Sequence, residues 1–134
     1  MDFTFGKKEK VVLNKDISAL LVSPKGFIAL YPVYINWIYY IADKPTKPKV
    51  LLLVPKKTFK KAHDRNRIKR KLREAYRLNK SEFFPDIPTN LQVCISISYK
   101  SSLDEDETMI EIYLKNAFEK FKRKFAQNLE KNNR

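Results

Sequence analysis

Cysteine and histidine are almost absent from this sequence, which contains one of each, Cys94 and His63. A single cysteine excludes an internal disulfide and a cysteine-rich zinc site. It also fits a reducing compartment, so we expect the protein in the cytoplasm. The same scarcity leaves few side chains from which a metal centre could be built, and we expect none.

Long hydrophobic runs are also missing. The longest candidate, Phe27 to Ala42, is interrupted by Pro32 and Asn36. It falls short of the roughly 20 apolar residues needed to span a bilayer. The first ten residues are mixed and charged, which is not the pattern of a signal peptide. We therefore expect no membrane partner.

Acidic residues are outnumbered by basic ones, 15 against 28, which gives a formal net charge of +13. The hydrophobic fraction of 43% is nevertheless large enough for a real core. A chain of 134 residues is expected to form one domain, here residues 1–134, with frayed ends at about 1–10 and 128–134. A compact and strongly basic domain calls for a polyanionic partner.

The first half of the sequence predicts a short helix followed by strands. Asn14 or Asp16 can cap a helix over residues 17–22, which a turn at residues 23–26 ends. Residues 27–42 favour extended structure, bent or broken near Pro32, because proline cannot donate to a strand ladder. Five consecutive apolar residues, 50–54, predict a strand covered on both faces.

The second half predicts one more strand and a final helix. Residues 81–90, with two prolines, read as a loop, and residues 91–99 alternate between apolar and small polar side chains. The acidic residues 104–107 favour a helix N-terminus, where they complement the helix dipole. Apolar residues then recur at helical spacing and predict a core-facing stripe: Ile110, Tyr113, Leu114, Ala117, Phe118, Phe121 and Phe125.

Basic residues are concentrated between Lys56 and Arg77, which hold eleven Lys or Arg against two acids. On a helical wheel the segment separates into two faces. The apolar side contains Ile68, Leu72, Ala75 and Tyr76, and the opposite side contains Asn66, Arg70, Arg73 and Arg77. Like charges on one face repel one another, a cost that a phosphate backbone would remove. The pattern indicates a nucleic-acid-binding helix.

Three short stretches carry a family resemblance: Val54-Pro55-Lys56-Lys57, the run from Ala62 to Arg70 with its Arg65-Asn66-Arg67, and Arg73-Glu74. Together they resemble the signature of the bacterial ribonuclease P protein subunit. The resemblance implies a small α+β domain of αβββαβα order, similar to the second domain of a ribosomal protein. It further implies a protein that binds a catalytic RNA and the 5′ leader of precursor tRNA, and so promotes endonucleolytic removal of the leader.

The family's functional residues can be carried over by position. The resemblance implies contacts to the catalytic RNA from Arg65, Asn66, Arg67, Lys69, Arg70, Arg73, Lys56, Lys57, Lys60 and Lys61. We expect replacement of Arg65 and Arg67 by alanine to weaken RNA binding and to leave the fold intact. The predicted leader-binding residues are Tyr34, Trp37, Ile17, Leu21, Gln92, Ser96 and Ser98. Ile17 and Leu21 stand where family members often have two phenylalanines, and Phe27 replaces a basic residue.

The resemblance implies that the RNA subunit carries the chemistry with its Mg²⁺ ions, and that one protein joins one RNA. We therefore expect no catalytic residue, cofactor or metal on the protein. The sequence agrees in having neither a histidine pair nor converging carboxylates of the kind that protein nucleases use. A general RNA-binding or ribosome-associated module remains an alternative, as does a DNA-binding regulator, which the lack of a short-turn partner helix argues against.

Overall fold

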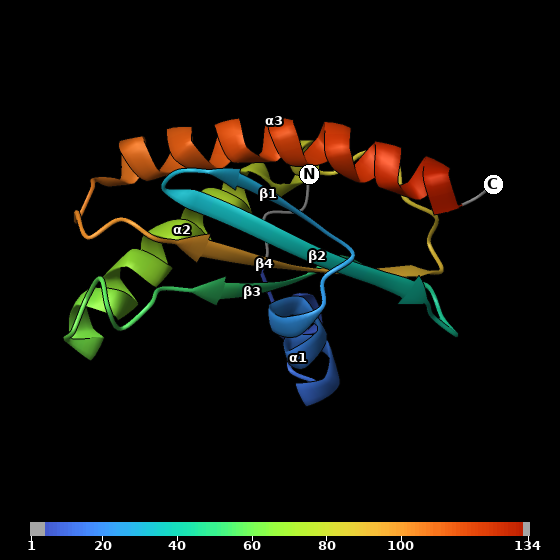
Figure 1. Cartoon of the computed structure of the whole chain (residues 1–134), viewed down its shortest axis with the longest axis horizontal. Helices are drawn as coiled ribbons and strands as arrows, with labels where there is room; N and C mark the ends of the chain where they lie inside the picture. Colours follow the sequence, from blue (N-terminus) through green and yellow to red (C-terminus); the bar gives the residue numbers. More distant parts are fainter. Residues whose placement is uncertain (1–4, 133–134) are drawn as a thin grey trace.

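The computed structural model describes residues 5–132 and shows a single small α+β domain (Figure 1). Its elements are η1 (Lys7–Glu9), α1 (Asn14–Val22), β1 (Gly26–Leu30), β2 (Val33–Ile41), β3 (Lys49–Leu53), α2 (Ala62–Phe83), β4 (Leu91–Tyr99) and α3 (Glu107–Asn132). After the one-turn η1, the order is the αβββαβα order that the resemblance implied.

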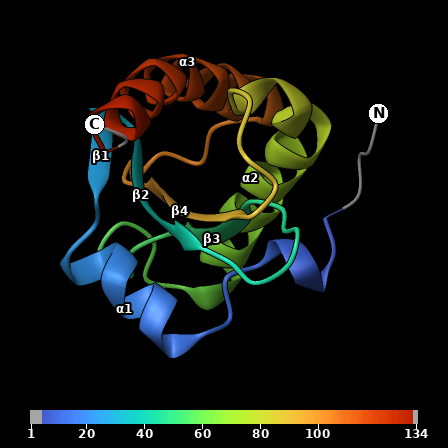
Figure 2. The same cartoon turned by 90° about the vertical axis from the view of Figure 1, so that its right-hand side faces the viewer.

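The four strands form one sheet in the order β1-β2-β4-β3. The β1–β2 and β2–β4 pairs are antiparallel, and the β3–β4 pair is parallel. Helices α2 and α3 lie on one side of the sheet and α1 lies on the other (Figure 2). The sheet is therefore the middle layer of the domain, and each of its faces has its own helical cover.

The alternation along β4 decides which side chain enters which layer. Val93, Ile95 and Ile97 enter the main core beneath α2 and α3. Cys94, which points the other way, joins a smaller cluster with residues of α1 and β2. The predicted strand over residues 91–99 and the apolar stripe of the last helix are both confirmed.

The predicted break near Pro32 is confirmed. Residues 27–42 form two strands, because the chain reverses at a turn containing the Tyr31–Pro32 peptide bond, which is cis, and β1 and β2 pair as a hairpin. The predicted strand over residues 50–54 corresponds to β3, but its expected cover on both faces needs correction, because Val50 and Val54 are buried and residues 51–53 are only half-buried. β3 is an edge strand, so one side of it lacks a neighbouring strand and its side chains are covered less completely.

The predicted caps of the first helix are wrong. Helix α1 begins at Asn14 with Leu13 in the capping position, and no side chain caps it. Asp16 is instead a buried residue of α1, and its carboxylate accepts a hydrogen bond of 3.2 Å from the hydroxyl of Tyr40 in β2. Burial, with the nearby Cys94 and Asp16, raises the pKa of Tyr40 to about 12. Burial and Asp16 likewise raise the pKa of the Cys94 thiol to about 12.

Residues near both ends of the described chain contact the rest of the domain. Phe5 packs on Tyr76 with ring centroids 5.3 Å apart, and Glu9 forms a buried ion pair with Lys80. Helix α3 continues to Asn132, through most of the segment expected to fray. The remaining residues of the two expected frayed ends, 1–4 and 133–134, lie outside the described residues.

Helix α2 also extends beyond its expected end, to Phe83, because Phe83 is buried and stacks on Phe118 at 4.0 Å between ring centroids. None of the helices within residues 5–132 is long and apolar enough to cross a membrane.

One close approach in the main core depends on a glycine. Gly26 of β1 pairs with Trp37 of β2, and a Cβ atom placed on Gly26 would lie 2.2 Å from Trp37 Cζ2. Trp37 itself is fully buried and packs edge-on against Phe121 and Phe125, with centroid distances of 5.1 and 6.0 Å. The ring has little room to move aside, because its neighbours are also close-packed.

We expect Gly26→Ala to lower the free energy of unfolding by about 1–3 kcal/mol, the usual cost of overpacking a core. Gly6→Ala is the matched control, because no atom lies within 4 Å of its added Cβ. The control should change stability by less than roughly 0.5 kcal/mol. Urea unfolding followed by the fluorescence of Trp37 measures both. Equal stability of the two variants would show that the Trp37 ring is free to shift.

Candidate nucleic-acid interface

Helix α2 has the two faces that its sequence predicted. Ile68, Leu72, Ala75 and Tyr76 are all buried against the rest of the domain. Contacts with α3 and β3 hold this stripe in place. The opposite side of the helix must therefore face solvent.

The outward side carries what we call the α2 ridge, formed by Asn66, Lys69, Arg70 and Arg73. Asn66, Arg70 and Arg73 are exposed and Lys69 is half-buried. Within residues 5–132 these four side chains have no hydrogen-bond or ion-pair partner. Three adjacent cations without internal partners raise the local potential, which attracts a polyanion.

Arg65 turns back towards the start of the helix and away from the ridge. Its guanidinium donates hydrogen bonds to the carbonyl oxygens of Phe59 and Lys60, at 2.8 and 3.0 Å. These bonds fix the loop that leads into α2. Arg65 thus has an internal structural role.

Arg67 is held by acids from two segments. Its Nη2 lies 3.1 Å from Asp64 of α2 and 2.7 Å from Asp104 of the β4–α3 loop. Lys71 joins the same cluster through a 2.9 Å contact with Asp104. The hydrogen bond from Lys71, with Arg67 beside it, lowers the pKa of the Asp104 carboxyl. The cluster ties the first half of α2 to the entrance of α3.

These contacts contradict the premise that Arg65 and Arg67 can be removed without structural effect. A helical wheel places both side chains off the apolar stripe, but it cannot show the carbonyls and carboxylates that the fold brings to them. Their assignment to RNA binding stays a prediction. Variants of Arg70 and Arg73 test the same face of the helix with fewer structural consequences.

The four lysines predicted to support the helix lie just before it. All four are exposed, and a turn in which Thr58 Oγ1 donates to the Pro55 carbonyl at 2.9 Å shapes this segment. They are Lys56, Lys57, Lys60 and Lys61. They extend the basic surface beyond the N-terminal end of α2.

The α1 side of the sheet offers a second candidate surface. Ala29, Tyr34, Ser98 and Leu53 form one row across the four strands. Tyr34, Ser98 and Leu53 are only half-buried, because α1 covers the neighbouring row, where Asn36 donates to the Leu20 carbonyl at 3.1 Å. We call these four residues the open row.

Lys100 lies beside the open row, and the sequence did not lead us to predict it as a binding residue. Its Nζ lies 4.5 Å from the centroid of the Tyr34 ring. The signal was present in the sequence, because Lys100 is two residues beyond Ser98 and therefore shares its direction. A cation beside a half-exposed aromatic ring suits a nucleotide, whose base can stack and whose phosphate needs a positive charge.

Trp37 does not belong to this surface, and its prediction as a leader-binding residue is wrong. It is fully buried on the opposite face of the sheet, where its indole Nε1 donates to Asn128 Oδ1 at 3.4 Å. The alternation of strand side chains gives the reason. Tyr34 and Trp37 are three positions apart on one strand and must point in opposite directions.

Gln92 and Ser96 point to the α1 side but are buried, so their prediction as leader contacts is also contradicted. Gln92 is 4% exposed and donates through Nε2 to the Lys47 carbonyl at 3.0 Å. Ser96 is 1% exposed. Ser98, further along the strand, is the member of this set that remains half-exposed.

The predicted α1 residues have different environments. Ile17 is half-buried and packs against the small cluster that contains Leu20 and Cys94. Leu21 is 54% exposed on the outer side of the helix. Phe27 is 56% exposed, and Lys124 lies over its ring at 4.8 Å. The structure therefore leaves Leu21 and Phe27 available to a ligand and gives Ile17 a packing role.

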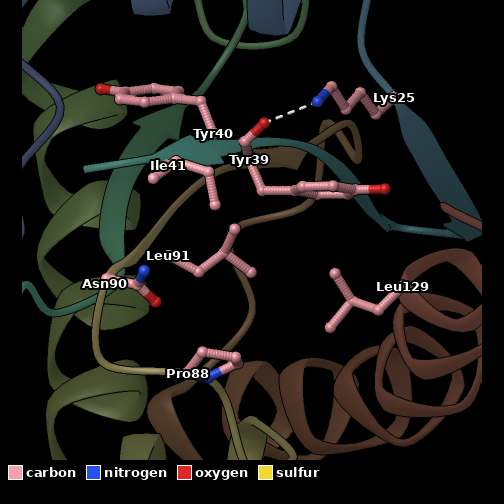
Figure 3. A pocket seen from close by; sticks show the side chains of 8 residues that line it. All are labelled: Lys25, Tyr39, Tyr40, Ile41, Pro88, Asn90, Leu91 and Leu129. Atoms are coloured by element: carbon pink, nitrogen blue, oxygen red, sulfur yellow. Dashed lines mark hydrogen bonds between the residues drawn. The ribbon is translucent and has the colours of Figure 1, made fainter. Parts of the chain in front are cut away.

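An apolar pocket of about 360 Å³ lies where β2 ends and β4 begins (Figure 3). Lys25 borders it, donating to the Tyr39 carbonyl at 2.7 Å, and Leu129 closes it from α3. None of the predicted RNA-binding or leader-binding residues lines this pocket.

His63 lies in the first turn of α2 with its side chain 74% exposed, and its Nδ1 is 3.7 Å from Asp64. Within residues 5–132 no group of three or more His, Cys, Asp or Glu side chains is arranged to hold a metal ion.

Comparison with known proteins agrees with this arrangement. The ribonuclease P family model matches residues 5–126. The ribonuclease P protein component of Porphyromonas gingivalis is 34% identical over 104 residues, which cover 76% of this chain and 74% of that protein. The component of Photorhabdus laumondii is 53% identical over 79 residues, covering 48% and 66%.

A solved structure supports the fold independently. The Staphylococcus aureus RNase P protein superposes with a TM-score of 0.61 at 17% sequence identity, covering 85% of this chain and 95% of that one. With the family match over residues 5–126, the chain belongs to the ribonuclease P protein family and is a protein subunit of ribonuclease P.

Proposed function

We propose that this subunit binds the catalytic RNA of ribonuclease P through the α2 ridge. The observation that carries the proposal is that Arg70 and Arg73 are exposed and have no partner within residues 5–132, although other basic residues of α2 are paired internally. Binding to a phosphate backbone would release counterions from the RNA and relieve the repulsion along the ridge. Arginine suits this role because its guanidinium can hold a phosphate through two hydrogen bonds.

In this proposal the RNA subunit supplies the chemistry and binds the Mg²⁺ ions, and the protein holds no cofactor. The chain's part is to bind and orient RNA in an endoribonuclease that matures the 5′ end of tRNA. The sequence contains a single histidine, His63, whose side chain is exposed. A second imidazole for paired acid–base catalysis is therefore missing, which supports this division of roles. We further propose a cytoplasmic complex with one protein per RNA.

The open row is the proposed contact for the 5′ leader of precursor tRNA. Tyr34 offers a ring on which a base can stack, and Lys100 places a charge beside it. Ser98 is small enough to let an extended strand approach the sheet. Leu21 and Phe27 are exposed apolar side chains that can widen the contact.

Reconstitution with a ribonuclease P RNA tests the function as a whole. The wild-type chain should raise the rate of precursor-tRNA cleavage at low Mg²⁺, where the RNA alone is slow. A chain that binds many RNAs equally and leaves this rate unchanged would instead be a general RNA-binding module.

The α2 ridge predicts a change in salt dependence. Arg70→Gln with Arg73→Gln should weaken binding to the RNA subunit and flatten the slope of log affinity against log salt by about 1.5, since each lost phosphate contact removes about 0.7–0.9. Filter binding at several KCl concentrations measures the slope.

A matched double variant on α3, Arg123→Gln with Lys131→Gln, removes the same charge from another exposed surface. It should leave the slope nearly unchanged. Equal flattening in both double variants would mean that only the net charge matters and that the α2 ridge is not a site.

The open row predicts a loss of substrate preference. Tyr34→Leu removes the ring and should cost about 1–3 kcal/mol of the preference of the holoenzyme for precursor over mature tRNA. Affinity for the RNA subunit should stay the same. Competition binding with precursor and mature tRNA measures the preference.

Two controls accompany Tyr34→Leu. Tyr31→Leu alters a tyrosine that is 67% exposed in the β1–β2 turn, outside the open row, and should behave as wild type. A precursor with a leader of one nucleotide should not distinguish Tyr34→Leu from wild type. If Tyr34→Leu weakens precursor and mature tRNA equally, the leader lies elsewhere.

A further inference from the structure

A cavity of about 510 Å³ lies where the loop between β2 and β3 meets the start of β4. Its walls contain three lysines, two threonines and one proline, and no carboxylate: Lys8, Pro45, Thr46, Lys47, Lys49 and Thr89. We call it the lysine cavity. No residue predicted from the sequence to contact RNA lines it. A concave site of one charge sign concentrates the electrostatic potential and attracts counter-ions.

Partly buried hydrogen bonds fix the shape of the wall of the lysine cavity. The Thr46 hydroxyl donates to the Gln92 side-chain oxygen, and Gln92 Nε2 donates to the Lys47 carbonyl at 3.0 Å. The Thr46 backbone N–H also donates to the Thr89 carbonyl at 2.8 Å. Gln92 thus holds the β2–β3 loop in place. A ligand would meet a wall that needs no ordering, which lowers the cost of binding.

Two of the lysines keep their charge available. Lys8 is exposed and Lys49 is half-buried, and neither has an ion pair or hydrogen bond to another residue of the described chain. The acid nearest in sequence to Lys8, Glu9, is committed to its buried ion pair with Lys80. An anion in the lysine cavity would therefore relieve repulsion without having to displace Glu9.

A second cavity is lined by residues of the α2 ridge and of β3, the strand that also contributes Lys49 to the lysine cavity. It has a volume of about 260 Å³, and Lys10, Lys69 and Arg73 line it together with Val50, Leu51 and Leu52 of β3. Lys10 forms an isolated bridge to Val50, the residue next to Lys49. Basic side chains therefore continue from the ridge, past the outer edge of β3, to the lysine cavity.

We propose that the lysine cavity binds a phosphodiester group of the catalytic RNA, as a second contact of the backbone that the α2 ridge engages. The inference rests on the proposed function, because the same RNA must reach both surfaces. Lysine ammonium groups supply the charge, and the Thr89 hydroxyl can donate a hydrogen bond to a phosphate oxygen, whereas the Thr46 hydroxyl already donates to Gln92. Such contacts position the RNA and carry no base specificity.

The test is the double variant Lys8→Gln with Lys49→Gln in the full chain. It should lower affinity for the ribonuclease P RNA and flatten the salt slope by about 1.5, the value for two lost phosphate contacts. The α3 double variant, which removes the same charge, should leave the slope unchanged. Circular dichroism and the melting temperature check that both variants are folded.

Two further variants separate charge from structure. Lys49→Arg keeps the positive charge and should retain the wild-type slope. Lys8→Gln alone alters an exposed side chain and should flatten the slope by about half as much as the double variant. If Lys49→Arg behaves like the glutamine variant, Lys49 acts through packing and the inference is wrong.

The substrate arm identifies the source of the phosphate. Excess protein drives assembly of the holoenzyme to completion, even for a variant that binds the RNA subunit more weakly. Under that condition the affinity of the holoenzyme for precursor tRNA should not change. A loss confined to this arm would overturn the assignment to the catalytic RNA.

The outcomes also separate this inference from the proposed function. A flattened slope in the α2-ridge variant with an unchanged slope in the lysine-cavity variant would overturn the inference alone. No binding of ribonuclease P RNA by the wild-type chain would overturn both.

Discussion

Burial of the central strand β4 on both faces is the constraint from which the candidate surfaces follow. Val93, Ile95 and Ile97 anchor α2 and α3 on one side, and Cys94 anchors α1 on the other. Because both faces are covered by helices, RNA can reach the domain at the outer side of α2, at the part of the sheet that α1 leaves open, and around the edge of β3. The α2 ridge, the open row and the lysine cavity occupy these three places.

The basic residues of α2 divide into an internal and an external set. Arg65, Arg67 and Lys71 are used to hold the loop before the helix and the loop before α3. Partly exposed ion pairs of this kind usually contribute between about 0 and 1 kcal/mol, so their main effect is to fix orientation. Arg70 and Arg73 gain from that orientation, because a helix held at both loops presents its outer face in one geometry.

Buried polar groups position the N-terminal third of the chain. Asp16, Tyr40 and Cys94 hold α1 against the sheet, and Glu9 with Lys80 holds η1 beside α2. Cys94 is fully buried in the small cluster, and burial raises the pKa of its thiol, so its role here is packing. The open row is bounded by α1 and the lysine cavity includes a residue of η1, so both surfaces depend on these contacts.

The sequence by itself determined the element order, the two faces of the basic helix and the family. These features rest on local periodicity and on three short stretches between Val54 and Glu74, which can be recognised without knowledge of the fold. Tertiary structure decided which polar residues remain available to RNA. Arg67 meets Asp104 from 37 positions away, Gln92 is covered by the loop at Thr46, and Lys10 is brought next to β3. Only the packing of distant segments makes these contacts, because no local pattern encodes which side chains the fold will bring together.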